Sequence, residues 1–197
     1  MSIVKQFVVK HIEPKNNELL HTNCIEFVKN KHYSGTCPNS SYHLFGMFFE
    51  ASLIGVAVFA KPTGRYQEKA YGTDIELTRL VLLDWPPRNS ETYFLSRCIK
   101  WLKKNTNFKS LLSLADGMES HEGTIYKAAN FEQLRIGIKK RIHSFLINKE
   151  KVHCRTCYGR WGTSSEQKLK NMFGESNVVP IKGVEKHVFR YNLRDKK

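Results

Sequence analysis

Hydrophobic residues over the first three quarters of the chain follow the spacing of strands in some segments and of helices in others. Short runs rich in β-branched and aromatic residues predict strands, whereas apolar residues three or four positions apart predict helices. The predicted strands are IVKQFVVKHI, YHLFGMFFE, SLIGVAVFA, GTDIELTRLVLLD, SLLSLA, FEQLRIGI and KRIHSFLI. Helices are expected over Glu18 to Lys31, from Asn89 or Ser90 to about Lys104, and over a short segment that carries Tyr126. This order predicts an α+β fold, with helices packed over a mixed central sheet.

The strand in GTDIELTRLVLLD has an alternation that assigns its side chains to two faces. The residues expected on one face are Ile75, Leu77, Val81 and Leu83, and those on the other are Glu76, Thr78 and Leu80. Arg79 then shares the apolar face, where a guanidinium is unfavourable unless it meets an anion or reaches an edge. In the helix that follows, the residues expected to face the core are Phe94, Leu95, Cys98, Ile99 and Leu102.

The character of the chain changes beyond residue 149. KVHCRTCYGRWGTSS is expected to form a basic, aromatic loop, and HVFRYNL a last strand. Ser164 and Gln167 have the spacing of a capping box at the start of a short helix. We therefore expect a catalytic domain over residues 1–149 and a basic C-terminal extension over 150–197 that packs on it.

The composition fits a folded chain, with 41% hydrophobic residues among 197. No apolar run approaches the roughly 18 residues of a membrane span. The start, MSIVKQFVVKHIEPKNN, lacks the apolar stretch and small-residue cleavage site of a secretory signal. We therefore expect no membrane partner and a location in a cytoplasm.

The net charge of +14 is unevenly distributed. Residues 135–197 hold 16 Lys and Arg residues against 5 Asp and Glu, whereas residues 1–134 hold 16 against 13. Because aromatic residues are interleaved with these basic ones, the pattern favours contact with nucleic acid over a merely solubilising tail. The candidate DNA contacts are Arg155, Tyr158, Arg160, Trp161, Lys168 and Lys170.

Candidate catalytic residues lie near the ends of the predicted strands and of the first helix. They are His32, Tyr33, Glu76, Arg79, Ser113 and Asp116. Glu76 is a candidate general base, and Arg79 a candidate anion contact, unless the two serve only local salt bridges. Asp116 closes a strand where open sheets place ligands, although an Asp before a short helix is also a common N-cap. His32, Tyr33 and Asp116 are also candidate ligands of an iron ion, since imidazole and carboxylate suit iron.

HEGTIYKAANF, together with the order of elements, resembles the GNAT acyltransferase fold. In that superfamily a tyrosine on this short helix often protonates the leaving thiolate, which nominates Tyr126. Asn130 stands where the superfamily has a glycine before Phe131, and because Asn tolerates a left-handed backbone we expect the turn to persist. The usual glycine-rich loop for the CoA pyrophosphate is replaced by LDWPPRNSETY, which has no glycine. The candidate cofactor contacts there, at a helix N-terminus, are Arg88, Asn89 and Ser90.

Five blocks in order, NKHYSG, GVAVFAKP, IELTRLVLLD, SRCIKWLKK and SLADGMESHEGTIYKAANF, resemble the Mom family of phage DNA-modification proteins. The resemblance spans about Asn30 to Leu134 and implies a GNAT-like fold and double-stranded DNA as partner. It also implies conversion of adenine to N6-carbamoylmethyl-adenine in the host cytoplasm, which protects phage DNA from restriction. The sequence does not identify the donor of the carbon unit, for which acetyl-CoA or a related molecule is one candidate.

Two other functions remain open from the residues. One is an acyl-CoA-dependent N-acetyltransferase of a small amine or protein, and the other is a non-catalytic nucleic-acid-binding module of the same fold. The sequence indicates neither the target DNA sequence nor the oligomeric state.

Overall fold

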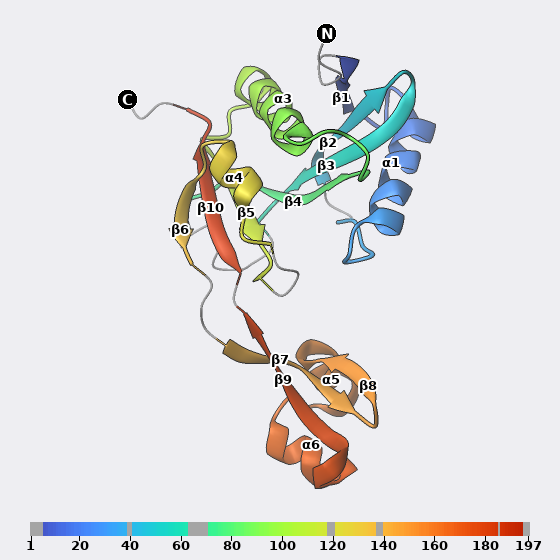
Figure 1. Ribbon diagram of the computed structural model, residues 1–197, viewed down its shortest axis with the longest axis vertical. Helices are drawn as coiled ribbons and strands as arrows, with labels where there is room; N and C mark the ends of the chain where they lie inside the picture. Colours follow the sequence, from blue (N-terminus) through green and yellow to red (C-terminus); the bar gives the residue numbers. More distant parts are fainter. Residues whose placement is uncertain are drawn as a thin grey trace. The chain divides into compact units, whose positions relative to one another are not determined.

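The computed structural model describes residues 6–38, 41–62, 71–117, 121–136, 140–184 and 186–194. The chain divides into two compact units. The first unit comprises residues 1–115, 123–135 and 188–197, and the second comprises residues 116–122 and 136–187. Figure 1 shows the elements of each.

Within the described ranges, the first unit has one seven-stranded sheet, covered by the helices α1, α3 and α4. In chain order its elements are β1 (Val8–Ile12), α1 (Glu18–Lys31), β2 (Ser41–Phe49), β3 (Ser52–Ala60), β4 (Ile75–Leu82), α3 (Ser90–Asn105), β5 (Ser110–Ala115), α4 (Thr124–Ala128), β6 (Glu132–Arg135) and β10 (His187–Asn192). The strand order is β1-β2-β3-β4-β5-β10-β6. Strands β1 to β4 pair antiparallel, whereas β4 and β5 pair parallel. The predicted α+β class with a mixed central sheet is confirmed.

Helices cover both faces of this sheet. Helix α1 packs Cys24 and Val28 against Val56 and Val58 of β3 on one face. Helices α3 and α4 pack against the larger apolar cluster on the other face. The five residues of α3 predicted to face the core are all buried, because their spacing of three and four keeps them on one side of the helix.

Strand β4 contains a β-bulge that the alternation did not predict. Val58 of β3 pairs with Arg79, and the next residue of β3 pairs with Leu77, so β4 holds one extra residue between these pairs. The extra residue reverses which face the later side chains occupy. Leu80 therefore packs with the cluster of α3, whereas Val81 packs with that of α1. The expected faces of Val81, Leu80 and Arg79 were wrong for this reason.

Strands β4 and β5 remain paired over only a short distance. Ile75 to Leu77 pair with Leu111 to Ser113, and among the described residues no β4–β5 pair follows. Two parallel strands that cease to pair leave backbone N–H and C=O groups on their facing edges available for other partners. The point where β4 and β5 separate lies beside candidate catalytic residues of both strands, among them Arg79 of β4 and Ser113 of β5.

The second unit is a three-stranded sheet in the order β8-β7-β9 with two helices. Its elements are β7 (Lys140–Ile147), β8 (Glu150–His153), α5 (Cys154–Trp161), α6 (Glu166–Phe173), the 3-10 helix η3 (Glu175–Asn177) and β9 (Val178–Val184). Its own core includes Phe145, Cys157 and Leu169. Asn148 and Lys149 both have positive φ, of 49° and 71°, as a tight hairpin between β7 and β8 requires.

Two predictions for this unit were wrong. The segment expected to be a loop contains the helix α5, because the His153 ring accepts from the Arg155 amide at 3.0 Å and Cys157 is buried in the core. The expected capping box at Ser164 is absent from the described structure, where Ser165 is the N-cap of α6 without a side-chain cap bond.

The division between the units differs from the expected boundary at residue 149. The second unit begins at about residue 136 and ends at about residue 187, because β10 returns to the first sheet between β5 and β6. Val188 of β10 pairs with Arg135 of β6, so the chain leaves and re-enters the first unit at neighbouring positions. The last strand was correctly predicted, but it belongs to the central sheet. Among the described residues, no helix has both the length and the apolar character needed to cross a membrane.

Candidate active site

Tyr126 lies on α4 and is buried in an aromatic environment. Its ring centroid is 5.5 Å from that of Phe131 and 5.2 Å from that of Phe189. Burial raises the pKa of Tyr126 above its ordinary value of 10.0; a hydrogen bond with the Ser113 side chain lowers that pKa, and the electrostatic effects of Tyr33 and Glu76 raise it. The phenol is therefore protonated at neutral pH and suited to donate a proton.

The hydroxyl of Ser113 faces this phenol from β5. Ser113 is fully buried, and among the described residues its Oγ has no hydrogen-bond partner of good geometry. A buried hydroxyl without a partner is unfavourable by about 1–3 kcal/mol. Ser113 Oγ and the Tyr126 phenol are thus two polar groups that lie close together beside an otherwise apolar cluster.

Glu76 brings a carboxyl group to the same region from β4. It is 4% exposed, and its cross-strand neighbours are Ala60 of β3 and Leu112 of β5. A buried carboxyl among apolar neighbours is typical of a functional group rather than of a surface ion pair. Tyr126 thus lies within electrostatic range of Tyr33, Glu76 and Ser113.

The loop after α1 carries His32 and Tyr33, whose ring centroids are 4.3 Å apart. The Ser34 amide donates to His32 Nδ1 at 3.1 Å, so the neutral imidazole carries its proton on Nε2. Tyr33 is 54% exposed, which leaves most of its ring open for stacking. Its catalytic role stays a prediction.

Arg79 fixes this loop to β4. Its Nε and one terminal nitrogen donate to the Thr36 carbonyl at 2.8 Å and the Thr36 hydroxyl at 2.9 Å, and the other terminal nitrogen donates to the Thr78 carbonyl at 2.7 Å. Three of its five N–H groups are used in this way. Arg79 is therefore seen as a positioning residue, and its predicted contact with an anion stays a prediction. Thr36 was not identified from the sequence, since nothing local to it indicates a partner 43 residues away.

Asp116 belongs to the second unit, unlike the other candidate catalytic residues. Its carboxylate is 3.5 Å from Lys186 Nζ. It is not the N-cap of α4, because that position is Gly123. Its predicted catalytic role stays a prediction. Within the described ranges, no group of three or more His, Cys, Asp or Glu side chains is placed to hold a metal, so the structure does not support the predicted iron site.

The N-terminus of α3 has a defined turn in place of a glycine-rich loop. Asn89 is its N-cap with φ 71°, and its side chain makes no cap hydrogen bond. The Ser90 hydroxyl is buried and donates to the Pro87 carbonyl at 2.6 Å, so it stabilises the turn. The first-turn amides of the helix and the neighbouring Arg88 are the remaining groups there for an anion.

The candidate DNA contacts all lie on the two helices of the second unit, but in different surroundings. Tyr158 is 65% exposed, and Arg155 and Lys168 are exposed. Trp161 packs on Phe173 with ring centroids 4.9 Å apart, at the edge of the core. Two of the cations already have carboxylate partners: Arg160 lies 3.3 Å from Glu150, and Lys170 lies 2.9 Å from Glu166 and 3.1 Å from Glu175.

Comparison with known proteins gives a family match over most of the chain. Residues 16–197 match the model of the Mom protein family. A curated relative, the methylcarbamoylase mom of Escherichia phage Mu, is 31% identical over 112 residues. That alignment covers 53% of this chain and 46% of the phage protein, so the chain aligns with about half the length of this relative.

Solved structures similar to this chain are GNAT acetyltransferases. The spermidine N-acetyltransferase of Vibrio cholerae, solved with CoA and spermine, has a TM-score of 0.52 at 6% identity, over 96% of each chain. An Escherichia coli N-acetyltransferase of a ribosomal-protein alanine has a TM-score of 0.52 at 7% identity, over 97% of this chain and 96% of its own. A GNAT-family structure from Desulfovibrio desulfuricans has a TM-score of 0.51 at 11% identity, over 95% of this chain and 99% of its own. At these identities the likeness establishes the GNAT fold alone.

Proposed function

The chain belongs to the Mom protein family, and we propose from this premise that it modifies adenine in double-stranded phage DNA to N6-carbamoylmethyl-adenine. The family and the fold support the more general statement that the chain is a transferase-like enzyme with a GNAT fold. The modification, its DNA substrate and its site in the host cytoplasm are our proposal. The observation that supports it most directly is the buried phenol of Tyr126 beside Ser113 and within range of Glu76.

The reaction requires two proton movements. The adenine N6 amine is a weak nucleophile because its lone pair is delocalised into the ring, and its base must leave the helix to enter a pocket. As N6 attacks the donor carbon, an N–C bond forms and the bond from that carbon to its leaving atom breaks. In this proposal Glu76 accepts the proton lost from N6, and Tyr126, which its raised pKa keeps protonated, returns one to the leaving atom.

The remaining residues support this chemistry by position. Exposed Tyr33 offers a face for stacking of the extruded base, and Arg79 holds its loop through Thr36. A cavity of about 310 Å³ between α3 and α4 is lined by Thr92, Ser96 and Lys103 among others, a polar and cationic set that fits a phosphate-bearing donor of the acyl-CoA class.

Mass spectrometry of nucleosides from plasmid DNA of expressing cells tests the proposal. A new adenine species is expected with the wild-type protein. Tyr126→Phe is expected to lower its yield at least about 100-fold, since a general acid contributes about 10²–10⁴ to the rate. The Phe ring keeps the packing on Phe131 and Phe189, so the fold is retained.

Tyr71→Phe is the control. Tyr71 lies in the first unit and lines neither the donor cavity nor the cavity between β1 and α3, and the change removes the same atom. Its DNA should remain modified. Unmodified DNA from folded wild-type protein, together with acetyl-CoA-dependent acetylation of an amine, would instead assign the N-acetyltransferase function. Equal loss in both variants would refute the role of Tyr126.

A further inference from the structure

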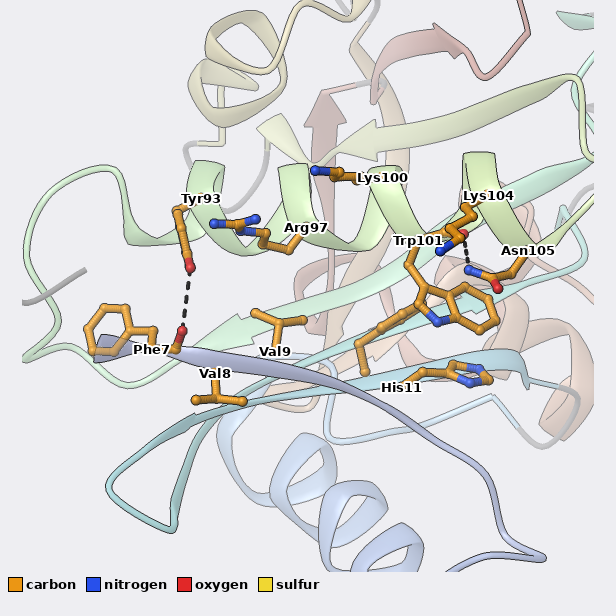
Figure 2. Close-up of a pocket in the computed structure, with 11 residues that line it drawn as sticks. Phe7, Val8, Val9, His11, Tyr93, Arg97, Lys100, Trp101, Lys104 and Asn105 are labelled. Atoms are coloured by element: carbon orange, nitrogen blue, oxygen red, sulfur yellow. Dashed lines mark hydrogen bonds between the residues drawn. The ribbon is translucent and has the colours of Figure 1, made fainter. Parts of the chain in front are cut away.

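A second cavity lies in the first unit, between β1 and α3 (Figure 2). Its volume is about 410 Å³, within the range of roughly 300–1,000 Å³ that is typical of small-molecule sites. It shares no lining residue with the cluster of Tyr33, Glu76, Ser113 and Tyr126, and it shares only Lys100 with the 310 Å³ cavity between α3 and α4. The cavity is therefore a place for a ligand apart from the candidate catalytic residues.

One side of the cavity is cationic. Arg97, Lys100 and Lys104 recur at helical spacing along α3 and line it together, as Figure 2 shows. Among the described residues that line it, none is acidic. The Arg97 guanidinium lies 4.9 Å from the centre of the Tyr93 ring, and the Tyr93 hydroxyl donates to the Phe7 carbonyl at 3.4 Å. These contacts hold the Arg97 guanidinium at the cavity wall. Together with Lys100 and Lys104 it would attract an anion.

The opposite part of the cavity is aromatic. The Trp101 indole stacks on the His11 ring with centroids 3.9 Å apart and planes at 29°, and Phe45 meets Trp101 edge-on at 5.4 Å. Both ring nitrogens of His11 are already engaged, Nε2 with His43 at 3.1 Å and Nδ1 with Glu13 at 3.3 Å. His11 therefore supports the indole rather than offering a polar atom, and this wall suits a planar ring.

We propose that this cavity binds a free mononucleotide, with the phosphate against Arg97, Lys100 and Lys104 and the base against Trp101. An inorganic anion would make no contact with the aromatic wall. A nucleotide carries both groups at a separation that one small cavity spans. The site uses none of the proposed catalytic residues, although Lys100 lines both this cavity and the one proposed for the acyl donor.

Isothermal titration calorimetry of the full chain with AMP, adenosine and ribose 5-phosphate tests this assignment. AMP is expected to bind more tightly than adenosine, which lacks the phosphate. Arg97→Gln and Lys104→Gln are each expected to weaken AMP binding about tenfold or more, because each removes a charge-assisted contact. Trp101→Leu is expected to weaken the binding of AMP but not of ribose 5-phosphate, which has no base to stack.

Lys10→Gln is the matched control. Lys10 lies on β1 between two cavity residues, but its Nζ lies 5.3 Å from the ring of Phe48, which packs in the cluster of α1 on the other face of the sheet. The Lys10→Gln substitution removes one positive charge and should leave AMP binding unchanged. Circular dichroism melting establishes that each variant is folded before titration.

Three results would overturn the proposal. The first is the absence of AMP binding by folded wild-type protein, and the second is equal weakening by Lys10→Gln and Lys104→Gln. The third is binding of a single-stranded oligonucleotide, but not of AMP, that is lost in Arg97→Gln and Lys104→Gln. That last pattern would assign the cavity to a nucleotide within a DNA strand rather than to a free one.

Discussion

Two asparagines provide the backbone conformation that the GNAT fold usually takes from glycine. Asn89 before α3 has φ 71°, and Asn130 after α4 has φ 62°. Asparagine enters this left-handed region at lower cost than most residues with a Cβ atom, so both turns form without a glycine. The turn at Asn130 brings the Phe131 amide to the Tyr126 carbonyl at 3.0 Å. The expectation that this turn would persist is confirmed.

Gly123, in contrast, cannot be replaced at low cost. Its φ is 73°, and a Cβ there would overlap the ring of Phe189, which contacts Tyr126. Gly123→Ala is expected to destabilise the fold by about 2–4 kcal/mol through overpacking and backbone strain. Urea unfolding measures this change.

Gly159 provides the contrast for that measurement. It lies within α5 with open space where a Cβ would stand. Gly159→Ala is expected to raise the free energy of unfolding by about 0.5–1 kcal/mol, since alanine favours the helix. A change of the same sign in both variants would contradict the steric argument at Gly123.

At the scale of elements, local periodicity predicted those whose packing depends on one helix face. The bounds of α1 and the five inward residues of α3 are as expected, because a 3.6-residue repeat is visible in the sequence alone. The faces of β4 beyond Leu77 were not predictable, since the bulge arises from its register with β3. Helix α5 was not predicted for a related reason. Its Cys157 packs against residues of β7 and β8, which precede the helix, and of β9, which follows it, and the sequence does not show these contacts.

The candidate site was predictable to a similar extent. Ser113 and Tyr126 lie on neighbouring elements of the sequence, and their approach follows from a strand and the short helix after it. The contact between Arg79 and Thr36 joins segments 43 residues apart, so only the folded structure reveals it. The assignment of Asp116 to the other unit likewise depends on where β10 returns.

Two histidines on neighbouring strands, His11 of β1 and His43 of β2, should make the stability of the fold depend on pH in the acidic range. Burial lowers the pKa of His43 from 6.5 to about 4, with a smaller lowering from His11 and an opposing effect of Glu13. Burial also lowers the pKa of His11, against the raising effect of Glu13. Trp101 and Phe108 complete the surroundings of His43. Both imidazoles are therefore neutral in the folded state at neutral pH.

Stability should then fall as pH decreases. Below about pH 6.5 the unfolded chain binds protons on these histidines while the fold resists them, so the loss extends from there towards pH 4. Melting temperatures between pH 7 and pH 4 measure it, and His43→Gln is expected to lose less stability over that interval than wild type. His21→Gln, on α1, should follow the wild-type profile. An unchanged profile in His43→Gln would contradict this origin.

At the scale of the whole molecule, the second unit is an insertion between two paired strands of the first. Residues 136–187 carry 11 Lys and Arg residues against 4 Asp and Glu. The ion pairs of Arg160 and Lys170 reduce how many of these cations are available to a polyanion. The predicted DNA contact of this unit therefore rests mainly on its exposed cations, among them Arg155 and Lys168.

Two lysines of α6 allow this distinction to be measured. Lys168→Gln is expected to weaken duplex DNA binding and to reduce the salt slope by about 0.9, the value for one phosphate contact on duplex DNA. Lys170→Gln also removes one positive charge from α6, but Lys170 already pairs with the carboxylates of Glu166 and Glu175. The salt slope of this variant should therefore remain close to that of wild type. Fluorescence anisotropy over a series of salt concentrations gives both slopes. A larger effect of Lys170→Gln would contradict the argument.

The place of β10 in the sheet also governs how the protein forms during translation. Strand β10 lies between β5 and β6 but is synthesised after the whole second unit. At about 5–20 residues per second, the ribosome needs about 3–10 s for residues 136–186. During that interval β5, with its buried sequence SLLSLA, is an apolar edge strand without its neighbour. Rapid folding of the second unit therefore shortens the time in which the nascent chain is open to aggregation.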